Sequence, residues 1–166
     1  MKHRMVLTAP AAAIGIFGLA GGVANGQVPV SPAPAQESLL TSADPHAAAN
    51  KRLVYDFWRE VFEAHHLDLA PKYLAESYIE HNPRFATGRD AFIENFSKAG
   101  PPKPIEPRMR REVVAIVAQG DLVVLAFVRE APDPKDAARK YTTTWFDMFR
   151  VADGKIAEHW DAAQLQ

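Results

Sequence analysis

The chain has no cysteine among its 166 residues. This absence excludes a disulfide framework, a lipid-modified cysteine and thiol chemistry. A surplus of positive charge is also lacking, because 19 Lys and Arg stand against 20 Asp and Glu. Without such a surplus there is no electrostatic case for nucleic acid or an anionic membrane as a partner. The longest basic cluster, residues 108–111 (RMRR), is interpreted as solvated positions at the start of a strand rather than a phosphate-binding group.

The first 26 residues contain the long apolar run of the chain and are typical of a secretory signal peptide. A basic start at residues 2–4 precedes the apolar region Met5–Ala24, and Ala24-Asn25-Gly26 has the small-x-small pattern of a cleavage site. An uncleaved membrane anchor is the alternative, since the run approaches the roughly 20 residues that span a bilayer. Pro10 and several glycines favour cleavage. We therefore expect an exported protein, periplasmic or secreted, with no stable membrane insertion after cleavage.

Residues 27–43 are rich in Pro, Ala and Ser and predict a disordered linker, so the folded domain is expected over residues 44–166. Asp44 and Pro45 are a typical helix start. Apolar periodicity and turn signals then predict helices first and strands later, which is the α+β class. The expected helices are 45–64, 67–74 and 90–99, with an extended segment at 75–83. The expected strands are 112–118, 122–130 and a hairpin within 140–164, with a polar loop at 131–138.

The last predicted hairpin surrounds Ala152-Asp153-Gly154, and its register decides which residues lie together. A two-residue Asp-Gly loop would place Asp147 opposite Trp160 and send His159 to the other face. A three-residue loop with a bulge at Gly154 would place Asp147 opposite His159, and Trp145 opposite Asp161. We favour the second register because it gathers the polar residues on one face.

In that register, side-chain alternation gives the hairpin two different faces. The inner face would carry Trp145, Asp147, Phe149, Ala157, His159 and Asp161. The outer face would carry Phe146, Met148, Ile156 and Trp160. Two carboxylates and an imidazole on an otherwise apolar face predict a pocket, since burying them is costly unless they are paired or reach water.

Four segments carry a family resemblance: YIEHNP (78–83), GRDAFIENF (88–96), GDLVVLAF (120–127) and WFDMFRVADGKIAEHWD (145–161). Together with the first helix, they resemble the SnoaL-like polyketide cyclase group of the nuclear transport factor 2-like superfamily, over about residues 50–164. The resemblance implies a cone-shaped α+β barrel, in which a strongly curved antiparallel sheet wraps around helices and leaves a pocket. It implies a cyclase of the aldol type, with isomerases and dehydratases among relatives of the same fold.

By position, the resemblance assigns the acid/base residue to Asp161, with His159 beside it, Asp147 similarly placed, and His81 and Asn82 across the pocket. Such a reaction needs a base for an acidic C–H proton and a donor for the enolate oxygen. Asp161 or Asp147 would be the base, and His159 or His81 the donor. The remaining candidates for substrate contact are aromatic: Phe57, Trp58, Trp145 and Phe149. Phe57 and Trp58 are also expected in the core of the first helix.

The expected ligand is a small hydrophobic molecule with a carbonyl group, and no cofactor is required. Three alternatives remain open. Asp147 and His159 can be a structural cross-strand pair; the fold can serve as a non-catalytic binding or interaction domain; and His159, Asp161 and His81 can ligate a metal. The apolar outer face predicts a homodimer.

Overall fold

The first helix begins as the sequence predicts. The Asp44 side chain accepts a hydrogen bond from the His46 backbone N–H at 2.9 Å, and Pro45 occupies the first helical position. The α-helix α1 (Pro45–Phe57) continues directly into a π-helical segment, η3 (Trp58–Glu63). In that segment the Ala64 N–H donates to the Arg59 carbonyl. The wider turn places Trp58 at the junction of the two helical forms, and such π segments are frequent at functional sites.

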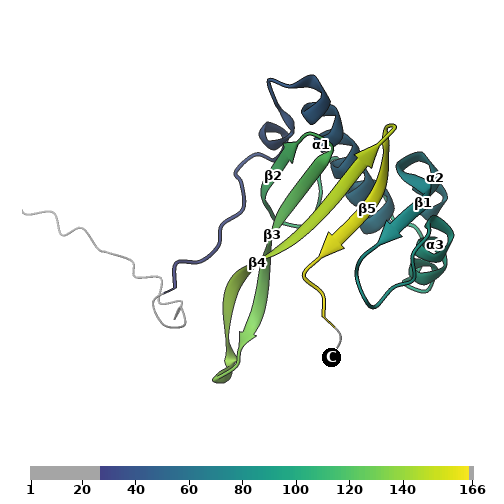
Figure 1. Cartoon of the computed structure of the whole chain (residues 1–166). Coiled ribbons are helices and arrows are strands. Elements are labelled where there is room, and N and C mark those ends of the chain that lie inside the picture. Colours follow the sequence, from purple (N-terminus) through teal and green to yellow (C-terminus); the bar gives the residue numbers. More distant parts are fainter. Residues whose placement is uncertain (1–26, 165–166) are drawn as a thin grey trace, which may run out of the picture.

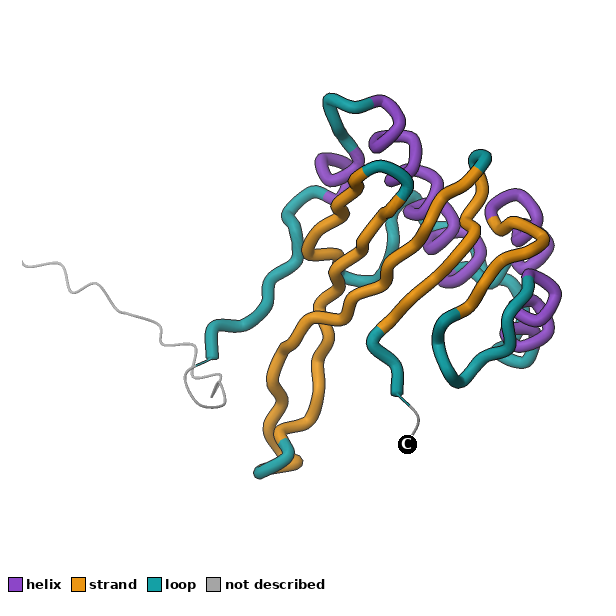
Figure 2. The backbone as a smooth tube through the Cα atoms, in the orientation of Figure 1, coloured by secondary structure: helices purple, strands orange, loops and turns teal. Residues whose placement is uncertain are grey.

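The computed structural model describes residues 27–164, in which helices pack on one side of a single five-stranded sheet with the order β1-β5-β4-β3-β2 (Figures 1 and 2). The expected α+β fold with helices against a curved sheet is confirmed. The remaining helices are η2 (Gln36–Leu40), η4 (Leu67–Leu69), α2 (Ala70–Tyr73) and α3 (Arg89–Ser97). The strands are β1 (Leu74–Glu80), β2 (Val113–Gln119), β3 (Leu122–Asp133), β4 (Asp136–Ala152) and β5 (Lys155–Asp161).

The sheet is antiparallel except at one edge. Strand β1 pairs with β5 in the parallel sense, with Glu80 opposite His159. The expectation of a purely antiparallel sheet is therefore wrong at this edge. Figure 1 shows β1 beside β5, although more than 70 residues separate them in sequence. This long-range pairing brings a strand from the first half of the chain to the hairpin at its end.

Residues 131–138 were expected to form a polar loop, and this prediction is wrong. Strands β3 and β4 run through almost all of this segment, and Asp133 pairs with Asp136 around a two-residue turn. The hairpin projects beyond the rest of the sheet (Figure 1), so its outer part is solvated and needs no apolar residues.

The expectation that residues 27–43 are disordered is wrong for the second half of that segment. Helix η2 lies there, and its Leu40 is buried in the core. Gln36 accepts a hydrogen bond from the Tyr55 hydroxyl at 2.6 Å and donates to the Met109 carbonyl at 3.0 Å. The segment therefore closes one end of the core.

The predicted signal peptide, residues 1–26, lies outside the described residues. From Gln27 to Gln164, no helix has the length and apolar character that crossing a bilayer requires.

Candidate functional site

A cavity of about 370 Å³ lies between the inner face of the sheet and the helical layer. Its walls are mainly aromatic, its acidic groups and His159 lie on β1, β4 and β5, and two arginines lie just before β2 and on β3. The aromatic lining residues are Phe57, Trp58, Phe62, Tyr78, Phe85, Phe92, Phe96, Trp145 and Phe149. The polar ones are Glu80, Arg111, Arg129, Asp147, His159 and Asp161. An apolar cavity with a few convergent polar groups is the usual form of a small-molecule site.

The register of the β4–β5 hairpin differs from the predicted one. Asp153 and Gly154 both have positive φ, and Ala152 pairs with Lys155, so the loop has two residues rather than three. A β-bulge follows at once, because Val151 pairs with Ile156 and Arg150 with Glu158. Ala157 is the extra residue of this bulge. It returns His159 and Asp161 to the inner face, from which a two-residue loop without a bulge would have turned His159 away.

The bulge turns His159 and Asp161 inward, as expected, but gives them different partners. Asp147 lies opposite Asp161, and Phe149 lies opposite His159. The predicted pairs Asp147 with His159 and Trp145 with Asp161 are therefore wrong. Trp145 pairs with Phe127 on β3 instead.

The same bulge corrects one face assignment. Ile156, expected on the outer face, is fully buried in the core beside Val151. The other outer-face predictions fit the structure better, since Phe146 is 52% exposed and Met148 lies opposite Trp160.

His159 lies between two carboxylates. Its Nδ1 is 2.9 Å from Glu80 Oε1, and its Nε2 is 3.5 Å from Asp147 Oδ1. Burial alone would lower the pKa of His159, but the hydrogen bonds and negative charges of Asp147 and Glu80 raise it to about 9. With carboxylates at both ring nitrogens, both carry a proton and the ring is an imidazolium at neutral pH. Phe149 stacks on this ring at 4.6 Å.

Glu80 completes the ion pair from β1. It also accepts hydrogen bonds from the Tyr78 hydroxyl at 2.7 Å and from the Asn82 backbone N–H at 2.9 Å. Burial would raise the pKa of Glu80, but the His159 charge and these hydrogen bonds hold it below its usual value. Burial and the neighbouring Glu80 carboxylate raise the pKa of Tyr78, which keeps this phenol neutral.

Asp147 is buried, and one of its oxygens is unused. Oδ1 accepts a hydrogen bond from Trp145 Nε1 at 2.9 Å and faces His159, whereas Oδ2 has no hydrogen-bond partner among residues 27–164. The indole N–H of Trp58 likewise has no partner within that range. Buried polar atoms are nearly always paired in native proteins, so each such exception asks for an explanation. Both residues line the cavity, although these two atoms are themselves buried, so a bound molecule supplies the missing partners only if it can reach them.

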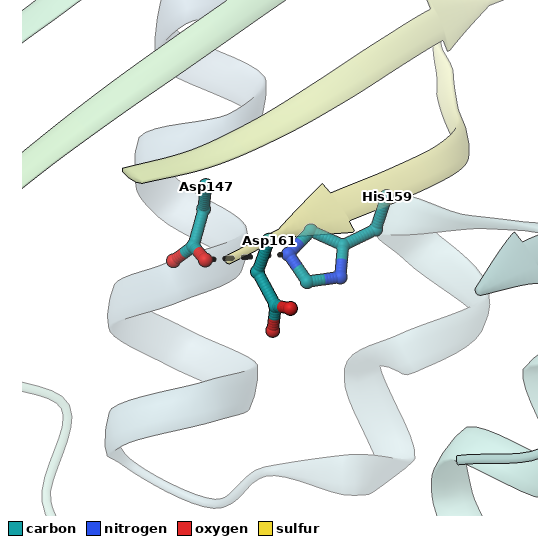
Figure 3. Close-up of side chains that lie close together, drawn as sticks. All are labelled: Asp147, His159 and Asp161. Atoms are coloured by element: carbon teal, nitrogen blue, oxygen red, sulfur yellow. Dashed lines mark ion pairs between the residues drawn. The ribbon is translucent and has the colours of Figure 1, made fainter. Parts of the chain in front are cut away.

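Asp161 is held more firmly. Its Oδ2 accepts from Asn82 Nδ2 at 2.7 Å, and its Oδ1 accepts from the Ala163 backbone N–H at 2.8 Å. Asn82 itself is buried and does not line the cavity. Its predicted role in substrate contact is therefore wrong, and it positions Asp161 instead. Figure 3 shows Asp147, His159 and Asp161 converging, with the ion pair between the first two dashed.

His81 is not part of this site, contrary to the prediction. Its ring stacks on Trp160 at 4.6 Å, and its Nε2 lies 3.0 Å from Glu158 Oε2. Both partners belong to the opposite side of β5 from His159. Since strand residues alternate, His81 and Glu80 must point to different faces, and Glu80 occupies the place that was assigned to His81.

Sequence reasoning missed Glu80, Tyr78, Arg111 and Arg129. Glu80 and Tyr78 lie two apart on an extended segment, which is the spacing of one strand face, but nothing local indicates that β1 pairs with β5. Arg111 was interpreted as a solvated position, and its place in the cavity wall corrects that interpretation.

Three side chains of the site are close enough together to hold a metal ion. One ligand atom each from Asp147, His159 and Asp161 lie within 4.8 Å of one another. A metal would have to displace the proton on His159 Nε2 and the ion pair with Asp147. His81, the third ligand in the metal alternative, lies on the other face of the sheet and does not take part.

Comparison with known proteins agrees with this architecture. The SnoaL-like domain family matches residues 54–159. A structure of a candidate polyketide cyclase from Acidithiobacillus ferrooxidans is 18% identical, covers 73% of this chain and 89% of its own, and superposes with a TM-score of 0.51. A candidate SnoaL-like polyketide cyclase from Jannaschia is 16% identical, with coverages of 74% and 91% and a TM-score of 0.48. An LEH-like epoxide hydrolase from M. tuberculosis is 15% identical, with coverages of 70% and 84% and a TM-score of 0.49. At these identities the likeness concerns the fold. Among curated proteins, none matches this sequence.

Proposed function

Because the chain belongs to the SnoaL-like family, we propose that it is a cofactor-independent acid/base enzyme acting on a small, largely apolar carbonyl compound. The reaction class is proton abstraction next to the carbonyl, as in an aldol-type cyclase, an isomerase or a dehydratase. The observation that carries the proposal is the unpaired, buried Oδ2 of Asp147, set beside the His159 imidazolium at the wall of an aromatic cavity.

Asp147 is assigned as the base. Its Oδ2 has a free acceptor position, whereas both oxygens of Asp161 already accept hydrogen bonds. The carboxylate takes the proton from the carbon next to the carbonyl, the C–H electron pair forms the C=C bond of the enolate, and the carbonyl π electrons move to oxygen. Trp145 donates to Oδ1, and the positive charge of His159 faces the same oxygen at 3.5 Å; together they orient the carboxylate.

His159 is assigned as the donor to the enolate oxygen. Its bond to Glu80 is short, but its Nε2 is 3.5 Å from Asp147, which is too long for a firm hydrogen bond. The Nε2–H is therefore not committed to Asp147 and can donate to a substrate oxygen placed beside it, where the positive charge stabilises the oxyanion as it develops. In a cyclisation the enolate carbon would attack a second carbonyl carbon of the same molecule; in an isomerisation the proton returns to another carbon.

Exchange of C–H protons tests this step without knowledge of the natural substrate. The aromatic ketone 2-tetralone has acidic protons beside its carbonyl, and their replacement by deuterium in D₂O is followed by proton NMR. Asp147→Asn should slow enzyme-dependent exchange about 100-fold to 10,000-fold, the usual contribution of a general base. Asp161→Asn is the matched variant and should have a smaller effect. Exchange at an equal rate in wild type and Asp147→Asn would refute the assignment.

A non-catalytic binding domain is the second candidate. It is favoured by the groups that are already paired at the site: His159 Nδ1 bonds Glu80, and both oxygens of Asp161 accept hydrogen bonds. For such a protein, 2-tetralone would bind without exchange, and Asp147→Asn would alter affinity only.

We also propose that the chain is exported and forms a homodimer through the outer face of the sheet. Val117, Val124, Met148 and Trp160 are register partners across four strands of that face. Val117 and Phe146 are 59% and 52% exposed, and an apolar area of this kind is a liability in a monomer.

Cleavage at the predicted site would give a mature protein that begins at Gln27, which amino-terminal sequencing of the natural protein checks.

The dimer is tested by sedimentation equilibrium at micromolar concentration. Phe146→Glu should yield monomers, because a charge would be buried in the interface. Ile105→Glu is the control, since Ile105 is an exposed apolar residue in the loop before β2. A monomeric wild type would contradict the proposal.

A further inference from the structure

Two arginines line the cavity at a distance from Asp147. Arg111 lies just before β2, and Arg129 lies on β3. Val113 pairs with Phe127, and the Val128 N–H donates to the Glu112 carbonyl, so the hairpin register carries Arg111 to the position opposite Arg129. The two guanidinium groups therefore belong to neighbouring positions on the same inner face.

Neither guanidinium group has a carboxylate partner among residues 27–164. Both are instead held over aromatic rings. The Arg111 Cζ lies 5.6 Å from the Trp58 ring centre and 5.1 Å from that of Phe127, and the Arg129 Cζ lies 4.9 Å from that of Trp145. By contrast Arg59 and Arg150, which do not line the cavity, each pair with two carboxylates. Stacking keeps a guanidinium plane in place and leaves its N–H edge for a ligand.

Strand β4 relates this pair to the acid/base groups. Thr143 is the register partner of Arg129, Trp145 follows on the same face, and Asp147 comes next. The register position of Arg129 therefore lies four residues from Asp147, which is about 13 Å along the strand. A molecule that reaches from Asp147 across the Trp145 ring would present its far end to the two arginines.

We propose that the substrate carries a carboxylate at the end away from its reacting carbonyl, and that Arg111 and Arg129 bind this carboxylate. Two planar guanidinium forks suit the planar carboxylate, which accepts parallel N–H···O bonds. The inference rests on the proposed function in treating the ligand as a substrate.

Binding of matched probes tests the proposal. Naphthalene-2-carboxylate, the neutral naphthalene-2-carboxamide and 2-naphthyl phosphate share the same apolar body, and their affinities are measured by isothermal titration calorimetry. The carboxylate should bind the wild type more tightly than the carboxamide. Arg111→Gln and Arg129→Gln should each weaken carboxylate binding about 10-fold to 100-fold, the usual value of charged hydrogen bonds. Arg129→Lys should fall between Arg129→Gln and wild type, because it keeps the charge but not the fork.

Two controls accompany these variants. Arg52→Gln removes an arginine that pairs with Glu37 away from the cavity and should leave carboxylate affinity unchanged. Carboxamide affinity should stay the same in all variants, which shows that the cavity is intact. Equal binding of carboxylate and carboxamide to the wild type, absence of carboxylate binding, or unchanged binding in both Gln variants would overturn the proposal. Tighter binding of the phosphate, lost in the same variants, would overturn the choice of carboxylate.

The outcome is separable from that of the proposed function. Asp147→Asn should slow deuterium exchange about 100-fold to 10,000-fold yet keep carboxylate affinity. If exchange does not depend on Asp147 while the arginine variants lose carboxylate binding, the acid/base assignment fails and the anion site stands.

Discussion

The two faces of strand β5 carry nearly the same set of groups in different surroundings. On the inner face His159 pairs with Glu80 and stacks on Phe149; on the outer face His81 pairs with Glu158 and stacks on Trp160. The side chains of the inner pair are 13% and 6% exposed, and those of the outer pair are 38% and 23% exposed. Similar contacts can therefore have different consequences, because water screens the outer pair and is largely excluded from the inner one.

The largest difference between the faces should be in activity. His159→Gln should slow deuterium exchange into 2-tetralone about 100-fold or more, since it removes the positive donor beside Asp147. His81→Gln should leave the rate within about twofold, because His81 lies outside the cavity. The NMR exchange assay measures both variants. Comparable losses in the two would mean that the facing of these residues does not govern the chemistry.

The next difference should be in the pH dependence of stability. The His159 pKa is raised from 6.5 to about 9, so its charged form stabilises the fold fully below pH 6.5, and this contribution is lost as the pH rises through about 9. The free energy of unfolding should fall by about 3 kcal/mol at most over that interval. Urea denaturation between pH 6 and pH 10 measures it. The fall should persist in His81→Gln and vanish in His159→Gln.

A smaller effect is expected when the carboxylate of each pair is replaced. Glu80→Gln should reduce the free energy of unfolding by about 1–3 kcal/mol, because it weakens a buried charged hydrogen bond. It should also move the alkaline limit of exchange activity toward neutral pH, since Glu80 helps to raise the His159 pKa. Glu158→Gln should leave the melting temperature nearly unchanged. Thermal melts and a pH-rate profile separate the two cases, and a pH-rate profile unaltered by Glu80→Gln would argue against this role of Glu80.

The smallest expected effect is that of metal removal. With both ring nitrogens of His159 facing carboxylates, we expect the imidazolium rather than a metal between Asp147 and Asp161. Dialysis against EDTA should leave the exchange rate unchanged, and elemental analysis of the purified protein should find no stoichiometric ion. A rate that falls with EDTA and returns with one metal would reverse this expectation.

Local patterns predicted much of this molecule. The Asp44 cap, the helical stripes and the strand alternation follow from nearby residues, and they suffice for the fold class. They also predicted correctly that Asp147, His159 and Asp161 face inward, although the hairpin register used for that prediction was wrong. The two-residue loop and the Ala157 bulge compensate for each other; Asp153-Gly154 is a typical signal for such a loop, but the bulge has no distinctive local signal.

The partners of these residues were harder to predict. Glu80 reaches His159 through a parallel pairing between distant strands, and Arg111 enters the cavity through the end of another hairpin. Such contacts depend on how the whole sheet is assembled. His81 was misplaced by a single position, and in a strand one position is enough to change the face.

The placement of β1 against β5 also affects the order in which the molecule can assemble. Strand β5 is synthesised after the other four strands of the sheet, and until it docks Glu80 has no imidazole beside it and the sheet lacks its connection to β1. Contacts so distant in sequence are slow to form, because the chain between them must first be ordered. During synthesis, the helices and the first strands must therefore wait for β5, and the aromatic cavity is among the last parts of the fold to form.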